Sequence, residues 1–189
     1  MGVHCDSVVA PTAMARPYQP SLLRGLHGIT ALLVLACWGS GLVVYSRYDG
    51  RWGRLPFELG GDWIDLHGSL GVALWPLALL FGLYSLSLGV RRLRQPANAA
   101  ALLALGLAVG TGKLMQEDWL RQGQLQHLAY GLHLLAWLVI GAAVLAHLAA
   151  VLARGGRPLA RSMFSLRQRS GDQPRDWPGQ IRRHFRSSS

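Results

Sequence analysis

Four long runs of apolar residues divide the chain, and short stretches that hold nearly all of its charges separate them. A bilayer core about 30 Å thick is crossed by roughly 20 apolar residues in a helix. The pattern predicts transmembrane helices over residues 21–45, 63–90, 97–115 and 125–153. The expected fold class is an all-α integral membrane protein, a four-helix transmembrane bundle in the inner cell membrane.

Two tails flank the predicted helices. Residues 1–20 form a short soluble segment with no basic region and no apolar stretch of signal-peptide length, so we expect the first membrane helix to direct insertion. Residues 154–189 are rich in Arg, Ser, Gly and Pro. We expect a basic cytoplasmic tail that is largely disordered after about residue 170, where apolar residues are few.

The composition supports a membrane protein over a nucleic-acid-binding one. Hydrophobic residues make up 51% of the chain and charged residues 15%, although the formal net charge is +10. The basic residues flank the apolar runs, where membrane topology places them. The basic character therefore does not indicate a nucleic-acid partner.

The basic residues also predict the orientation. Ten Lys and Arg residues lie in the N-terminal segment, the RRLR turn and residues 154–169. The other two loops carry five, together with six acidic residues. Because Lys and Arg are retained on the cytoplasmic side, both termini are expected there.

Two histidines in the last apolar run suggest the chemistry. His133 and His147 are fourteen residues apart with no charge between them. Fourteen helical residues come close to four full turns, so both rings share one face and stand about 21 Å apart along the axis. One imidazole is therefore expected near each side of the membrane.

Two further histidines complete two pairs. His27 and His67 lie near the starts of the first and second runs. With the predicted orientation, His27 and His147 lie at the inner side, and His67 and His133 at the outer side. Two neutral imidazoles are strong axial ligands for a haem iron and leave no open position, which suits electron transfer. We expect two b-type haems with these four iron ligands, held non-covalently because no C-x-x-C-H motif occurs.

Simpler interpretations remain open at this point. Each histidine alone is as well explained by a hydrogen bond to a neighbouring helix. His127 is a rival outer ligand, about 9 Å nearer the outer surface than His133. A glycine follows both His27 and His67, and it provides space either for a flat macrocycle or for a close helix approach.

The order of these features resembles a known family. One histidine on each of the first two helices and two on the fourth, fourteen residues apart, is similar to the prokaryotic cytochrome b561 family. That family belongs to a wider group with the B-type cytochrome subunit of nickel–iron hydrogenases. The resemblance covers residues 18–166 and implies the pairs His27–His147 and His67–His133, with electron transfer from quinol through two b haems.

Three functions follow as hypotheses. The first is a dihaem b-type membrane cytochrome that relays electrons between the quinone pool and another redox partner, with possible quinol oxidoreductase activity. The second is a haem-binding anchor subunit of a larger dehydrogenase or hydrogenase complex. The third is a haem-free four-helix membrane protein that transports a metal or acts as a scaffold. Quinone or quinol, membrane lipid, a redox protein and a second copy of the chain are the expected partners.

Overall fold

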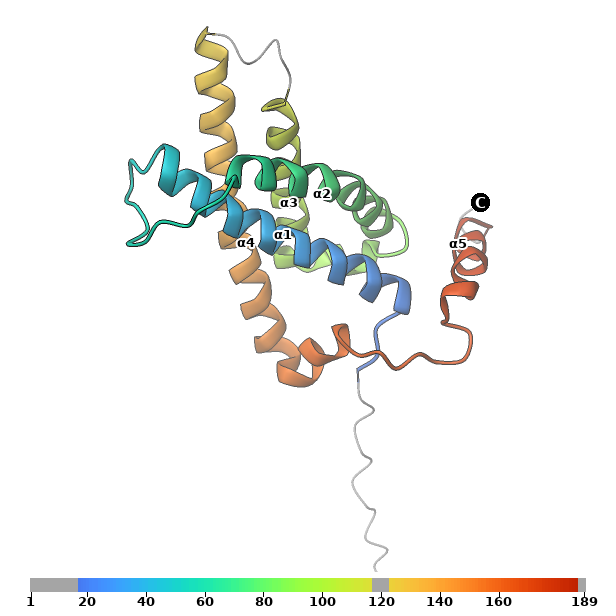
Figure 1. The fold of residues 1–189 in the computed structure, drawn as a ribbon. Coiled ribbons are helices and arrows are strands. Elements are labelled where there is room, and N and C mark those ends of the chain that lie inside the picture. Colours follow the sequence, from blue (N-terminus) through green and yellow to red (C-terminus); the bar gives the residue numbers. More distant parts are fainter. Residues whose placement is uncertain (1–16, 117–122, 187–189) are drawn as a thin grey trace, which may run out of the picture.

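The computed structural model describes residues 17–116 and 123–186 of the protein (Figure 1). Four of its helices are long and apolar enough to cross a membrane, which confirms the predicted multi-pass membrane architecture. They are α1 Ser21–Tyr48, α2 Trp63–Leu86, α3 Pro96–Leu114 and α4 Gly123–Met163. The shorter elements are the 3-10 turns η1 Val90–Arg94 and η3 Pro174–Asp176, and the helix α5 Trp177–Arg186.

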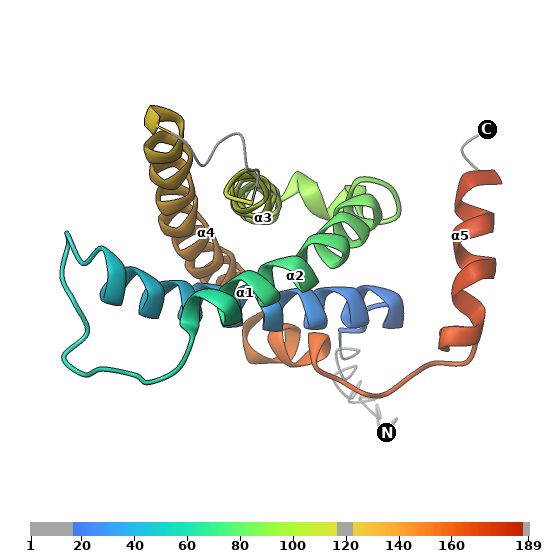
Figure 2. The same cartoon turned by 45° about the horizontal axis from the view of Figure 1, so that its top comes forward.

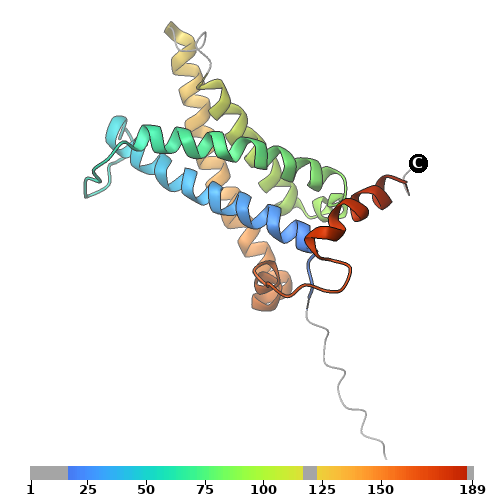
Figure 3. The same ribbon diagram turned by 45° about the vertical axis from the view of Figure 1, so that its right-hand side comes forward.

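The four long helices form two antiparallel pairs. Helices α1 and α2 lie side by side, and α3 and α4 form the second pair, which crosses the first obliquely (Figure 3). Figure 2 shows the same crossing with α3 seen nearly end-on. All four helices contribute to the small buried core, which consists of Val34, Leu74, Ala104, Leu105 and Ile140.

The outer surfaces of the helices are apolar. Leu32, Leu103 and Leu145 are 68%, 74% and 69% exposed, on three different helices. In water such surfaces would be costly, but in a bilayer they contact lipid chains. The polar side chains of the helices instead turn inward, since Thr30, Ser40 and Thr111 are all buried.

Two helix ends differ from the sequence prediction. Helix α2 ends at Leu86 rather than near residue 90, because the Gly89 amide bonds back to the Tyr84 carbonyl and η1 follows. Helix α4 continues past residue 153 to Met163. A left-handed glycine, Gly156 with φ of 56°, breaks it, and Pro158 follows in the next turn.

The C-terminal tail is ordered further than expected. Residues 177–186 form α5, where the sequence predicted a largely disordered segment. Trp177, Ile181 and Phe185 recur every four residues on one face of α5, so the helix is amphipathic. Its start is attached to α1, because Trp177 Nε1 donates to Ser21 Oγ at 2.8 Å.

Asp172 caps α1 from a position 151 residues away. Pro20 precedes α1 and provides no side-chain cap. The Asp172 carboxylate accepts instead from the Ser21 backbone N–H at 2.8 Å, from Ser21 Oγ at 2.9 Å and from the Tyr18 hydroxyl. A carboxylate at a helix N-terminus also interacts favourably with the helix dipole. The tail is thereby tied to the first membrane helix.

A second carboxylate orders the opposite end of α1. Asp49 pairs with Arg51 at 2.8 Å and accepts a hydrogen bond from the Tyr130 hydroxyl of α4 at 2.6 Å. The hydrogen bonds from Arg51 and Tyr130 lower the pKa of Asp49 to about 2. This carboxylate is thus charged at physiological pH and links the α1–α2 loop to α4.

Candidate functional site

His67 of α2 and His133 of α4, which the sequence analysis expects at the outer side, face each other and are called the outer pair below; His27 and His147 are called the inner pair. The ring centroids of His67 and His133 are 6.0 Å apart, with an interplanar angle of 61°. His67 lies four residues after the start of α2, where the Asp65 backbone N–H donates to the capping carboxylate of Asp62 at 3.0 Å. The cap fixes where α2 starts, and so fixes the depth of His67.

Each outer histidine has a hydroxyl partner on a different helix. Ser40 Oγ of α1 lies 3.0 Å from His67 Nδ1, and Thr111 Oγ1 of α3 lies 3.0 Å from His133 Nδ1. Both hydroxyls also bond carbonyls of their own helices, Ser40 to Cys37 at 3.1 Å and Thr111 to Leu107 at 2.8 Å.

This arrangement selects one tautomer for each outer ring. A hydroxyl has a single proton, and Ser40 and Thr111 each donate theirs in a hydrogen bond to a carbonyl of their own helix. The hydroxyl oxygen must then accept from the histidine Nδ1–H. Each outer imidazole therefore keeps the lone pair on Nε2, which is the nitrogen available to bind a metal.

The inner histidines form a second pair, between α1 and α4. The ring centroids of His27 and His147 are 6.1 Å apart, with an interplanar angle of 41°. Phe81 of α2 packs edge-on against His27 at 5.9 Å. His147 Nδ1 and Thr30 Oγ1 are buried without a hydrogen-bond partner among the described residues. The inner pair thus differs from the outer pair in its polar surroundings.

Two tryptophans join α1 and α4 between the pairs. Trp38 and Trp137 stack with ring centroids 4.8 Å apart and planes 11° from parallel. Each indole N–H donates to the backbone carbonyl of the other residue, at 3.2 Å and 3.0 Å. Trp137 is four residues after His133 and ten before His147, so this contact sets the register of α4 against α1.

Glycines allow the close approaches around these rings. A Cβ at Gly41 would lie 3.2 Å from His67 Cε1, one at Gly112 would lie 3.3 Å from His133 Cε1, and one at Gly141 would lie 2.8 Å from Trp38 Nε1. Gly28 and Gly68, which directly follow His27 and His67, differ. A Cβ at either position would meet no described atom within 4 Å, so these glycines border open space rather than a helix contact.

The geometry fits a metal that takes most of its ligands from a macrocycle. An imidazole nitrogen binds a metal at about 2.0 Å, and the ring centroid lies roughly 1 Å beyond it, so two rings on one metal have centroids about 6 Å apart. Both pairs have this separation. Each supplies two nitrogens, which matches the axial ligand set of a b haem.

The structure brings together the residues that the sequence pairs. His27 lies against His147 and His67 against His133, whereas His127 is exposed near the start of α4. The sequence analysis missed Ser40 and Thr111. A polar side chain inside an apolar run is a general sign of a buried partner, and that sign was present in both helices.

Comparison with known proteins identifies a family that the chain resembles. A family model described as prokaryotic cytochrome b561 matches residues 18–166, which include all four membrane helices through Met163 and all four paired histidines. No curated protein and no solved structure matches the chain.

Proposed function

The chain belongs to the prokaryotic cytochrome b561 family of haem-bearing membrane electron-transfer proteins, and from this we propose that it is a dihaem relay between the quinone pool and a second redox partner. His27 and His147 are the proposed axial ligands of an inner haem, and His67 and His133 those of an outer haem. The two ring pairs, each with centroids about 6 Å apart, are the observation that carries this proposal.

The proposed orientation has both termini in the cytoplasm. The start of α1, the turn η1 and the end of α4 carry most of the basic residues of the membrane domain. The acidic residues gather at the opposite ends of the helices, in the loop that includes Asp49. The positive-inside rule then assigns the His27–His147 pair to the cytoplasmic side.

The protein supplies position, ligands and a dry path. A b haem between two histidines supplies one-electron transfer with no position open to oxygen. Ser40 and Thr111 hold the outer imidazoles in the ligating tautomer. The Trp38–Trp137 contact holds α4 at fixed register, so the inner and outer ligands keep their spacing without a moving part.

The lipid exposure of the helices indicates how an electron donor reaches the protein. Because their outer surfaces are apolar, a lipid-soluble two-electron donor such as quinol reaches the bundle from within the bilayer. Haems held by the His27–His147 and His67–His133 pairs would accept its electrons one at a time. A partner protein at one membrane face completes the relay.

Single histidine variants test the ligand pairs. The reduced-minus-oxidised visible spectrum of the purified protein should show two b-haem components. His27→Ala and His147→Ala should remove the same component, since both residues bind the inner iron. His67→Ala and His133→Ala should remove the other. His127→Ala is the matched control and should retain both.

Two results would contradict these assignments. If the His27→Ala and His133→Ala variants lost the same spectral component, the proposed ligand pairs would be wrong. A His133→Ala protein that keeps both components, beside a His127→Ala protein that loses one, would transfer the outer ligand to His127.

A further inference from the structure

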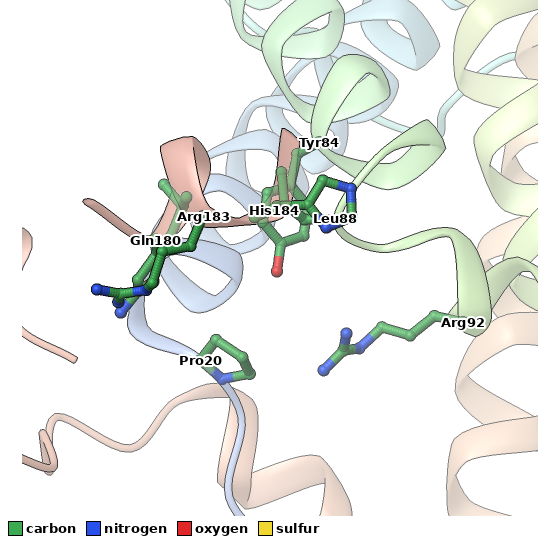
Figure 4. A pocket seen from close by; sticks show the side chains of 8 residues that line it. Pro20, Tyr84, Leu88, Arg92, Gln180, Arg183 and His184 are labelled. Carbon is green, nitrogen blue, oxygen red and sulfur yellow. The ribbon is translucent and has the colours of Figure 1, made fainter. Parts of the chain in front are cut away.

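A cationic cavity lies at the membrane face where α1 begins and α2 ends. Its volume is about 460 Å³. The lining includes Pro20, Tyr84, Leu88, Arg92, Arg183 and His184. Figure 4 shows Arg92 reaching into this space from η1, with Arg183 of α5 on the opposite side. The cavity thus lies between the membrane domain and the C-terminal helix.

The cavity joins apolar and cationic surfaces at the level of a lipid headgroup. Leu22 and Leu88 lie at the first turn of α1 and just after the last turn of α2, where the hydrocarbon region ends. Arg92 follows Leu88 in the turn η1, and Arg183 lies on α5, so both arginines lie outside the four membrane helices. Two guanidinium groups above an apolar wall match a phosphate attached to acyl chains.

One acid beside the cavity, Asp172, already has hydrogen-bond partners in α1 and in the segment before it. Asp172 contacts Gln180, which lines the cavity, at 3.3 Å. Its carboxylate is already bonded by Tyr18 and by the amide and hydroxyl of Ser21. Asp172 itself is absent from the cavity lining, whose charged side chains are Arg92 and Arg183.

The C-terminal segment carries exposed apolar side chains that are suited to a membrane surface. On α5, Ile181 and Phe185 are 37% and 59% exposed, and the arginines of the helix lie on other faces. Phe164 and Leu166, which follow the last turn of α4, are 79% and 95% exposed. Exposed apolar side chains interleaved with arginines are typical of segments that lie in the headgroup region.

We propose that this cavity binds one anionic phospholipid. Arg92 and Arg183 contact its phosphate, Leu22 and Leu88 contact the upper acyl chains, and α5 lies flat on the membrane over the headgroup. The lipid then joins the C-terminal helix to α1 and α2. The assignment of this lipid to the cytoplasmic leaflet depends on the orientation proposed above. The existence of the lipid site does not depend on that orientation.

Native mass spectrometry of the full-length protein in detergent tests the site. The protein is titrated with dioleoylphosphatidylglycerol or with dioleoylphosphatidylcholine. One phosphatidylglycerol molecule should bind tightly and phosphatidylcholine should not. Arg92→Gln with Arg183→Gln should weaken binding by roughly thirtyfold, because each arginine contributes about a fivefold factor at an anionic lipid surface.

A control variant separates this site from net charge. Arg91→Gln with Arg175→Gln removes the same charge from two exposed arginines outside the cavity lining, and it should change binding by less than about twofold. The single variant Arg183→Gln, at an exposed position on α5, covers the case in which loss of Arg92 disturbs folding. It should weaken binding about fivefold.

Three results would overturn the proposal. The first is equal binding of phosphatidylglycerol and phosphatidylcholine, and the second is an equal loss of phosphatidylglycerol binding in the cavity and control double variants. The third is displacement of phosphatidylglycerol by a short-chain quinone, which would make the cavity a quinone site. The haem spectrum, recorded on the same samples, reports on the proposed function separately. The lipid proposal can therefore be contradicted while both haem components remain in the spectrum. Equally, the haem proposal can be contradicted while lipid binding remains.

Discussion

The two histidine pairs differ in the hydrogen-bond partners of their rings. Both outer rings bond a hydroxyl through Nδ1, whereas His147 Nδ1 is buried without a partner in the described residues. A hydrogen bond from Nδ1–H makes an imidazole a more basic ligand. A more basic ligand favours ferric iron, so we expect the outer haem to have the lower potential.

Replacement of the two hydroxyls tests this difference. Ser40→Ala and Thr111→Val each remove one acceptor, so the potential of the outer haem should rise, by less than about 60 mV, the equivalent of a tenfold change for one electron. A redox titration followed in the visible spectrum measures it. Thr30→Val, near the inner pair, is the control and should leave the outer potential unchanged. An unchanged or lower outer potential in both outer variants would contradict the assigned tautomers.

At the residue scale, the sequence was more informative about ligands than about their supports. The spacing of His133 and His147 follows from helix geometry alone. The partners of these rings do not, because Ser40 and Thr111 come from α1 and α3 and meet α2 and α4 only in the packed bundle.

At the scale of elements, helix α1 depends on a distant cap. Burial tends to raise the pKa of Asp172, but the hydrogen bonds from Tyr18 and Ser21 outweigh it, and the pKa lies below its usual value. A lowered folded-state pKa means that the carboxylate stabilises the fold fully above the unfolded pKa of about 3.9. This stabilisation is lost as the pH falls through the folded pKa.

Asp172→Asn should loosen the attachment of the tail to α1. A lost helix cap costs roughly 1 kcal/mol, which corresponds to about a fivefold more frequent opening. Hydrogen exchange of the amides in the first turn of α1 should speed up by that factor. In the wild-type protein the same increase should develop gradually as the pH falls below about 4 and be complete only below the lowered folded-state pKa of Asp172. Asp65→Asn, at an exposed acid of α2, is the control, and exchange unaffected by Asp172→Asn would rule out the cap.

The helices themselves were largely predictable, and their ends less so. Apolar runs of membrane length give α1 to α4 directly. The extension of α4 to Met163 crosses a basic stretch containing Gly156 and Pro158, residues that ordinarily end a helix. The tail helix α5 is anchored by Trp177 to Ser21, a contact that no local pattern reveals.

At the scale of the whole molecule, the orientation determines which of the two proposed haems faces the cytoplasm. A reporter fused after Ser189 or inserted in the turn Val90–Arg94 should report the cytoplasm. One inserted between Arg51 and Gly61 should report the opposite side, because fewer basic residues and more acids lie there. Two reporters, one active only in the cytoplasm and one active only on the opposite side of the membrane, measure the location of each fusion site. An external C-terminus would exchange the inner and outer labels of both haems.

The sequence by itself determined the properties that depend on one segment at a time. Hydropathy identified the membrane helices, and helical periodicity placed His133 and His147 on one face at two depths. The tertiary structure decided what each of those residues touches. The Ser40–His67 bond, the Trp38–Trp137 stack and the Asp172 cap join positions 27, 99 and 151 residues apart. Such contacts depend on the crossing of whole helices, because only packing sets which distant side chains meet.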